Sequence, residues 1–411
     1  MAFEHLLFYQ HNVQVFLLGH VEKYQGVIVP LSVATAFKDG TDGFIRALCK
    51  ASPEKVYMID PRSALFQARW DRKKKRDAHR RMATQLGKVA LETLDADRAI
   101  TVDDLTADAI EDMVRTSLAF QLDFGQQDNA KLKKYAKLAG VATLGRLESP
   151  RRLVPPYFQF TSENDPWYSK TMAILEESQR YLKERDGSLL TELCPVLHSR
   201  GFADVVDWGK VAGELKARAV QTAFLYPNNL KEIEIGLPDL QRYRDAVKAI
   251  AGAGVRCYTL HGGYFAVLLS KHGLAGFGNG IGYGEWRDSG YHSGGQANIR
   301  IYVPKLHRFV QANEVQFLLE AFGEFIAEDS DLLSGLLSSG GSALAVTTEQ
   351  ANNHFLDCRA AETKFVAEAD IQAIKAELTS TADVLGTCKV KAAEVISQKG
   401  RETLLRWADA L

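Results

Sequence analysis

The sequence lacks several features that would assign it to a specialised class. Its five cysteines (Cys49, Cys194, Cys257, Cys358 and Cys388) are scattered and form no Cys-x-x-Cys pair. This excludes a recognisable disulfide framework and a cysteine zinc site of the usual spacing. No apolar run approaches the roughly 20 residues that span a bilayer, and the N-terminus has no secretory-signal pattern. We therefore expect a cytoplasmic protein without membrane contact.

An excess of charge of either sign is also missing. Lys plus Arg total 50 against 51 for Asp plus Glu, so the net charge of -1 disfavours a global polyanion-binding role. One basic run nevertheless follows Trp70, and it consists of Arg72, Lys73, Lys74, Lys75 and Arg76. Such a cluster can neutralise several phosphates, and a tryptophan can stack on a base. The run predicts nucleic-acid contact, with a solvated helix face as the alternative.

Strand-like apolar runs alternate with amphipathic helical stretches, which indicates an α/β protein with a parallel sheet. The expected strands span residues 27–33, 56–60, 153–160, 189–198, 222–226, 255–261, 274–281 and 298–303, and Val13 to Leu18 would make a ninth. Eight such strands with helices between them predict a (β/α)8 TIM-type barrel, with an open doubly wound sheet as the alternative. The link from Glu285 to Asn298 has no helical pattern, so one of the last strands could belong to an appended hairpin.

Three segments depart from this alternation. Residues 67–148 are rich in charge and in helix-forming residues, which predicts a helical insertion within a barrel made of residues 1–66 and 149–329. Residues 330–345 are rich in Ser, Gly and Leu and predict a linker. Residues 346–411 predict a helical C-terminal tail, which could pack on the barrel, bind a partner protein or mediate self-association.

Candidate site residues follow from one rule, since the carboxyl ends of barrel strands build the active face. A carboxylate or imidazole there can act as acid or base, so we expect Asp60, His261 and Glu285 to be catalytic. The residues expected to bind substrate are Arg62, Gln159, His198, Tyr226, Asn228, Gly262, Gly263 and Tyr283, and Glu163 and Glu192 also follow apolar runs. The alternative for Asp60 is an Asx-turn cap that also pairs with Arg62.

Glycines are concentrated at Gly262–Gly263 and between Gly273 and Gly284. Glycines before a helix can expose N–H groups to a phosphate, which predicts a phosphorylated ligand at this end of the barrel. The alternative is that small residues are needed where strands pack tightly. Neither a Rossmann nor a Walker pattern is present, and His198 and His261 lack metal-site spacing. The sequence therefore predicts no cofactor and no metal.

The segment from Tyr258 to Gly263, continued through Gly273 to Glu285, resembles the end of the barrel in tRNA-guanine transglycosylases. In that family a strand ending in a glycine pair leads through a helix and a glycine to the last strand and a nucleophilic aspartate. Met58-Ile59-Asp60, followed by Phe66-Gln67, is similar to the family's Asp-Ser-Gly-Gly-Phe-Gln segment. The resemblance places Asp60 in the acid/base position.

Two parts of the family pattern are replaced in this chain. Gly278 and Asn279 stand where the nucleophilic aspartate would be, and the family's zinc-binding cysteines have no counterpart. The resemblance implies a protein that acts on a nucleotide or a base in nucleic acid without the covalent step, either a transferase that exchanges the base or a hydrolase. The alternative is a non-catalytic binding barrel that assembles with nucleic acid or with a protein partner.

The basic run generates the first prediction. If it contacts nucleic acid, changing Lys73, Lys74 and Lys75 to Glu should abolish binding of labelled RNA and DNA, and the wild-type affinity should fall steeply with salt. Fluorescence anisotropy across a salt series measures both. Absence of wild-type binding at low salt would leave the run as a solvated helix face.

Overall fold

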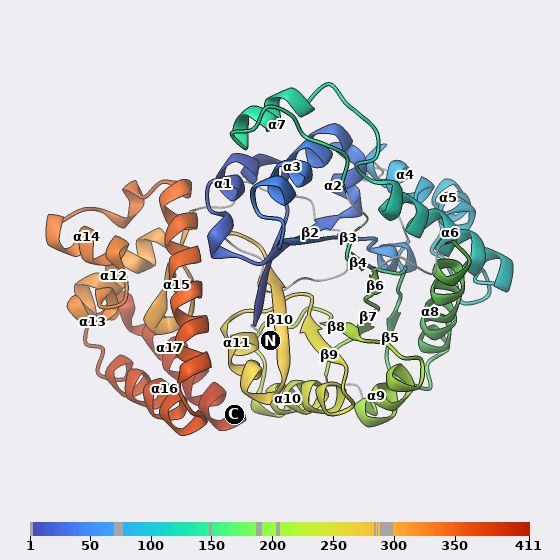
Figure 1. Ribbon diagram of the computed structural model, residues 1–411. Helices are drawn as coiled ribbons and strands as arrows, with labels where there is room; N and C mark the ends of the chain where they lie inside the picture. The colour runs from blue at the N-terminus through green and yellow to red at the C-terminus, as the bar shows by residue number, and fades with distance from the viewer. Residues whose placement is uncertain are drawn as a thin grey trace.

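The computed structural model describes residues 3–69, 77–147, 150–185, 191–202, 206–282, 285, 287 and 299–411. Its centre is a sheet of eight parallel strands in the order β3-β2-β1-β10-β9-β8-β7-β5 (Figure 1). The strands are β1 (Glu4–Phe8), β2 (Gly26–Pro30), β3 (Val56–Asp60), β5 (Gln159–Phe160), β7 (Val196–Ser199), β8 (Thr222–Pro227), β9 (Arg256–Thr259) and β10 (Leu274–Asn279). Because β1 pairs with both β2 and β10, the first and last strands are neighbours, as in a (β/α)8 barrel.

The fourth and fifth barrel strands are each broken in two. A short strand, β4 (Arg152–Leu153), precedes β5 and pairs in parallel with β6 (Glu192–Leu193), which precedes β7. Pro155 and Pro156 lie between β4 and β5, and Pro195 lies between β6 and β7. Proline has no N–H to donate to a strand ladder, so the pairing is interrupted at these positions.

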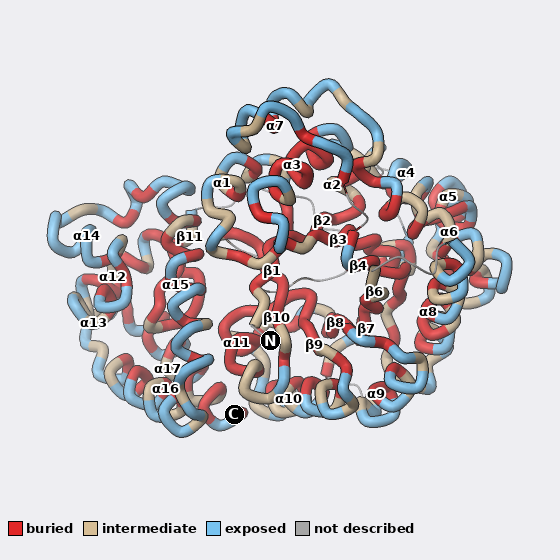
Figure 2. Tube along the Cα trace, in the orientation of Figure 1, coloured by how far each residue is buried: buried red, intermediate tan, exposed pale blue. Residues whose placement is uncertain are grey.

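Side chains alternate between the barrel interior and its outer surface. Ile28, Met58 and Phe224 belong to the interior cluster, whereas Val29 and Leu225 face the surrounding helices. This period of two is the geometry of a strand that is buried on both faces. Figure 2 shows the strands and the inward faces of the helices as buried, with exposed residues on the outer helical surfaces.

Glycine is required at two positions of β10, where this strand lies close to neighbouring backbone. A Cβ on Gly278 would lie 2.4 Å from the carbonyl oxygen of Leu260, and one on Gly276 would lie 2.4 Å from that of Glu4. Neither backbone oxygen can move without breaking the sheet. Close packing, the alternative weighed for these glycines, therefore accounts for both.

The barrel has a seam between β3 and β5 where side chains replace backbone pairing. The Ser63 hydroxyl accepts from the N–H of Tyr157 (2.7 Å) and donates to its carbonyl (2.5 Å). The Gln67 side chain likewise bonds the N–H (2.6 Å) and the carbonyl (2.9 Å) of Gln159. Each side chain thus offers one donor and one acceptor, as a neighbouring strand would.

The helical insertion contributes a third bridge of the same kind. The Gln121 amide donates to the carbonyl of Val154 (2.8 Å) and accepts from its N–H (3.0 Å). Gln121 lies on α6 (Ala107–Asp123), where it is buried. The insertion therefore supplies part of the barrel's closure.

Helices surround the sheet. The first group comprises α1 (Gln14–Leu18), α2 (Leu31–Ala36), α3 (Lys38–Ala51) and, in the insertion, α4 (Asp77–Thr84), α5 (Lys88–Asp95), α6 and α7 (Leu132–Leu138). The second comprises α8 (Pro166–Arg185), α9 (Trp208–Ala217), α10 (Leu237–Gly252) and α11 (Tyr264–Leu268). They carry the chain from each parallel strand to the next.

The C-terminal part gathers on one side of the barrel, next to β10 and α11 (Figure 1). It contains the antiparallel hairpin of β11 (Arg300–Val303) and β12 (Arg308–Gln311). Its helices are α12 (Ala312–Phe322), α13 (Glu324–Ala327), α14 (Asp331–Ser339), α15 (Thr348–Glu368), α16 (Ile371–Leu385) and α17 (Lys391–Ala410). Trp407 of α17 is fully buried, and its indole donates to the carbonyl of Glu232 (3.2 Å). The tail packs on the barrel.

The (β/α)8 prediction is confirmed, but some strand assignments change. Residues 14–18 form a helix, and the first barrel strand is β1, which the sequence did not indicate because its apolar run is only three residues long, Leu6 to Phe8. The predicted strand at 298–303 corresponds to β11, which belongs to the appended hairpin. Helix α14 occupies most of the stretch for which a linker was predicted.

The third seam bridge can be tested by Gln121→Met, which keeps the side-chain length but removes both bonds to Val154. Leaving buried backbone groups unpaired should lower the free energy of unfolding by about 1–3 kcal/mol for each group. Urea denaturation measures the change. Gln179→Met, which removes one half-buried bond to the Arg218 carbonyl, is the control and should cost less. An equal loss in both variants would contradict a special role for the seam.

Candidate active site at the barrel mouth

Seven side chains form a closed ring, called the mouth ring, at the carboxyl ends of the barrel strands. Each contacts the next through a stacked, tilted or edge-to-face ring pair, a hydrogen bond, an ion pair or a cation–π contact. In order they are Phe8, His261, Tyr226, His198, Tyr157, Asp60 and Arg62, and Arg62 returns to Phe8. The rule that barrel strand ends carry the active face points to this location.

One half of the ring is aromatic. His261 stacks on Phe8 with ring centroids 4.3 Å apart, and His198 stacks on Tyr226 at 4.1 Å. Tyr226 and His261 are tilted neighbours at 5.1 Å. Imidazole rings packed in this way have fixed orientations; His198 is fully buried, whereas His261 is 8% exposed.

The other half is polar and centres on Asp60, which is 1% exposed. Its carboxylate accepts from the Tyr157 hydroxyl (2.8 Å), the Arg62 N–H (3.1 Å) and the Arg62 guanidinium (3.2 Å). The turn cap and the Arg62 pair, both considered as alternatives for Asp60, are thus present. Burial and the Asp60 charge raise the pKa of Tyr157 well above its ordinary value, so its hydroxyl keeps its proton.

The Arg62 backbone has a left-handed conformation (φ 50°, ψ 35°). A non-glycine residue in this region is strained, and such strain is concentrated at functional sites. Ser63, the next residue, forms the first seam bridge to Tyr157. The seam therefore holds Arg62 in place beside Asp60.

A second guanidinium, that of Arg287, reaches the same cavity. The Arg287 carbonyl accepts from the N–H of Asn229 (2.9 Å) and, at 3.4 Å, from the Tyr226 hydroxyl. The Arg62 charge, followed by burial, lowers the pKa of Arg287 to about 10. Among the described residues that line the cavity there are thus two guanidiniums and one carboxylate, which gives these residues one excess positive charge when both histidines are neutral.

The space between these side chains is small, about 10 Å³. That is room for about one water molecule. The ring is consequently a packed floor at the end of the barrel.

Glu285 lies outside the residues that line this cavity. Its carboxylate accepts from Arg359 (2.8 Å) and packs against Gly263, where a Cβ would lie 3.1 Å from the Glu285 Cδ atom. Glu232 approaches the same glycine from the other side. Burial raises the pKa of Glu285 to about 7 and that of Glu232 to about 8.

The glycine pair has structural roles. The N–H groups of Gly263 and Phe265, at the start of α11, donate to the Glu232 carboxylate instead of remaining available for a phosphate. A Cβ on Gly262 would lie 2.6 Å from that of Ala266. At this helix start Glu232, a residue that the sequence did not indicate, occupies the expected phosphate position.

The remaining predicted residues are dispersed. Gln159 contacts His198 (3.3 Å) beside the ring, and Asn228 donates its N–H to the Ser199 carbonyl in the turn after β8. Glu163 accepts from the Asp207 N–H at the start of α9, and Glu192 pairs with Arg256 (2.5 Å) at the opposite end of the barrel. The predicted residues Tyr283, Arg72, Lys73, Lys74, Lys75 and Arg76 lie outside the described residues.

Phe8, Tyr157, Arg287 and Glu232 were missed by the sequence rule. Phe8 ends β1 and would have been selected had that strand been recognised. Tyr157 follows the Pro155–Pro156 break, so it lies within a predicted strand, away from its end. Arg287 and Glu232 lie in loops with no periodic signal.

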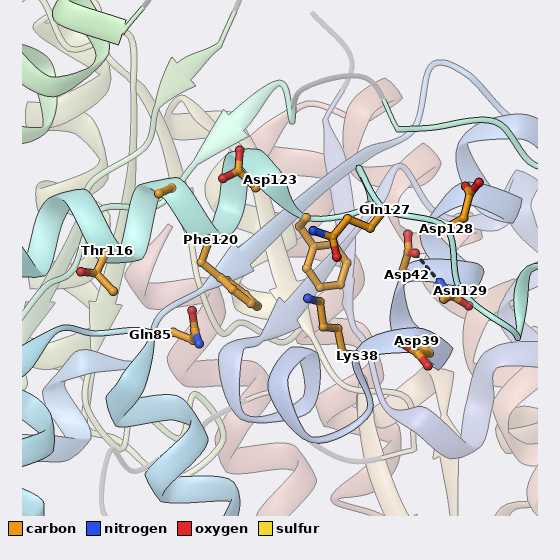
Figure 3. A pocket seen from close by; sticks show the side chains of 13 residues that line it. Lys38, Asp39, Asp42, Gln85, Thr116, Phe120, Asp123, Gln127, Asp128 and Asn129 are labelled. Carbon is orange, nitrogen blue, oxygen red and sulfur yellow. Dashed lines mark hydrogen bonds between the residues drawn. The ribbon is translucent and has the colours of Figure 1, made fainter.

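A larger cavity of about 390 Å³ lies away from the mouth, between the start of α3, α6 and the segment that follows α6 (Figure 3). At one end Asn129 donates to Asp42 (2.5 Å), which is also paired with the buried Arg46 (2.7 Å). These contacts anchor the segment after α6 to α3. None of the predicted site residues lines this cavity.

Among the described residues, no group of three or more His, Cys, Asp or Glu side chains could hold a metal ion. His198 and His261 belong to no such group there. Within the same residues, no helix is both long and apolar enough to cross a membrane.

The buried Glu232 predicts a pH dependence of stability. Its pKa is raised on folding, so between about pH 4.5 and 8 the folded state keeps a proton that the unfolded state releases. Stability should therefore fall as pH rises through this window. Glu232→Gln should flatten the fall in Tm between pH 5 and 8.5. The exposed Glu234→Gln is the control, and identical slopes in wild type and Glu232→Gln would contradict the assignment.

No protein-family model and no curated protein matches the chain. Solved structures that match include one described as a fructose-1,6-biphosphate aldolase from Coccidioides immitis (9% identity, 89% of this chain and 88% of that chain, TM-score 0.34). A D-psicose 3-epimerase matches at 9% identity over 62% and 84% (TM-score 0.30), and Eubacterium rectale Amy13B at 7% over 87% and 79% (TM-score 0.36). At these TM-scores the likeness says nothing about activity.

Proposed function

We propose that the protein is a barrel enzyme that binds a small anionic substrate of the phosphate-ester class against the mouth ring. The observation that carries the proposal is the pair of guanidiniums, Arg62 and Arg287, set against the single carboxylate of Asp60. Buried charges require partners, and arginine matches the oxygen geometry of phosphate in a bidentate manner. An anion on the ring would balance the excess charge.

Asp60 is the proposed acid/base group. Its carboxylate is aligned by three hydrogen-bond donors, namely the Tyr157 hydroxyl and the N–H and guanidinium of Arg62. His261 lies in the same cavity and can hold or release a proton at its ring edge. Asp60 and His261 are thus the proposed catalytic residues, whereas Glu285 lies outside the cavity and is not one of them.

A nucleotide is the substrate within this class that fits the resemblance to tRNA-guanine transglycosylases, with Asp60 in the acid/base place. The ring is a packed floor, so the substrate lies on it, with its phosphate against Arg62 and Arg287. The proposed reaction is cleavage of the glycosidic bond, in which the base is exchanged for another base or removed by water.

One observation favours the non-catalytic alternative. Asn279 stands near the place of the family's nucleophile and is fully buried, with its Oδ1 atom 2.8 Å from His5 Nε2. It has no access to the mouth. Binding without turnover would therefore support a binding barrel over an enzyme.

Binding should be measured by calorimetry and thermal shift at constant ionic strength, with inorganic phosphate, nucleoside monophosphates, sugar phosphates and short oligonucleotides as separate probes. Arg287→Met should weaken binding of the preferred probe by about tenfold or more, since a charge-assisted contact is lost. Arg115→Met, on the exposed surface of α6 and paired with Glu111, is the matched control and should not change affinity.

The same probes test catalysis. Asp60→Asn keeps the shape of the side chain and should retain binding while turnover of the bound nucleotide falls at least a hundredfold. Release of free base, followed by chromatography, is the measurement. If no phosphate-bearing probe binds the wild-type protein, the proposal fails. If binding occurs and Asp60→Asn turns over normally, the acid/base assignment fails.

A further inference from the structure

One buried arginine of the C-terminal tail contacts a residue that follows the last barrel strand. Arg359 of α15 is 0% exposed, and its guanidinium bonds Glu285 (2.8 Å) and pairs with Glu362 (3.0 Å). Three aromatic rings, those of Phe277, Tyr302 and Phe355, surround the guanidinium at 5.1–5.6 Å. A charge buried this deeply has one fixed position, set by its carboxylates.

Glu285 connects this arginine to the mouth in two ways. It is two residues from Arg287, whose carbonyl is held by Asn229 and Tyr226. Its carboxylate also packs on Gly263, directly after the turn that carries His261. Fixing Glu285 therefore restrains Arg287, two residues further along the chain, and packs the Glu285 carboxylate against the turn that carries His261.

We propose that Arg359 is a positioning residue, through which the tail holds Glu285 and so places Arg287 at the mouth ring. The inference rests on the proposed function, because it gives the tail a role in binding the anionic substrate. In this proposal the tail stabilises the site through Glu285 and does not contact the substrate.

A larger network supports the rigidity of this link. Glu362 also accepts from the Tyr302 hydroxyl (2.8 Å) and pairs with His307 (2.6 Å), which stacks on Tyr264 of α11 with centroids 3.5 Å apart. The tail, the hairpin and α11 are thus joined around Arg359. Displacement of Arg359 would remove the partner of the Glu285 carboxylate.

The first measurement is hydrogen exchange of the peptide spanning residues 279–287 in the ligand-free, full-length protein. Arg359→Met should increase exchange in this peptide, and Arg359→Lys should restore part of the protection, since an ammonium can still reach Glu285 but cannot bridge both carboxylates as a fork. Leu378→Ala, in the buried core of α16, is the control for general loosening of the tail. Unchanged exchange in Arg359→Met overturns the inference, whether or not any ligand binds.

The second measurement is the affinity for the phosphate probe that binds the wild-type protein. Arg359→Met and Glu285→Gln should each weaken binding about tenfold, and the double variant should be no weaker than either single one, because both act through one link. Leu378→Ala should leave affinity unchanged. Increased exchange with unchanged affinity overturns the positioning role. If no probe binds the wild-type protein, the proposed function fails, and with it the role in binding, while exchange still decides the structural link.

Discussion

At the seam between β3 and β5, side chains form the hydrogen bonds that backbone pairing forms elsewhere in the barrel. The positions of the residues at the barrel mouth depend on these side chains. Ser63 and Gln67 follow directly after β3, so the bonds that close the seam also fix the Asp60–Arg62 segment. Gln121 comes from α6 of the insertion, so this helix pairs backbone groups of the fourth barrel strand. Without these amides and the hydroxyl, buried N–H and C=O groups of the fourth strand would be unpaired.

Charge is distributed unequally between the two sides of the last barrel strands. Among the described residues, the mouth cavity is lined by two guanidiniums and one carboxylate, whereas the network behind it sets Glu285 and Glu362 against Arg359 and His307. Burial keeps Glu232, which lies beside this network, protonated up to about pH 8. Glu285 belongs to the network and Arg287, two residues further along the chain, to the mouth cavity.

The strand-end rule found five residues of the mouth cavity because parallel strands all end on one face. Asp60, Arg62, His198, Tyr226 and His261 were predicted in this way. Tyr157 was missed because prolines break the fourth strand, and Phe8 because β1 is a short strand near the N-terminus. Glu285 was expected beside Asp60 but pairs with Arg359 instead, since loops are oriented by tertiary contacts.

The sequence by itself determined the alternation of strands and helices, the barrel class and the strand ends, because hydrophobic periodicity is a local property of the chain. Only the tertiary structure decided which side chains meet. The Ser63–Tyr157 bridge spans 94 residues, and the Arg359–Glu285 pair spans 74. No local pattern encodes such pairs. They arise because buried polar groups must find partners once the chain is compact.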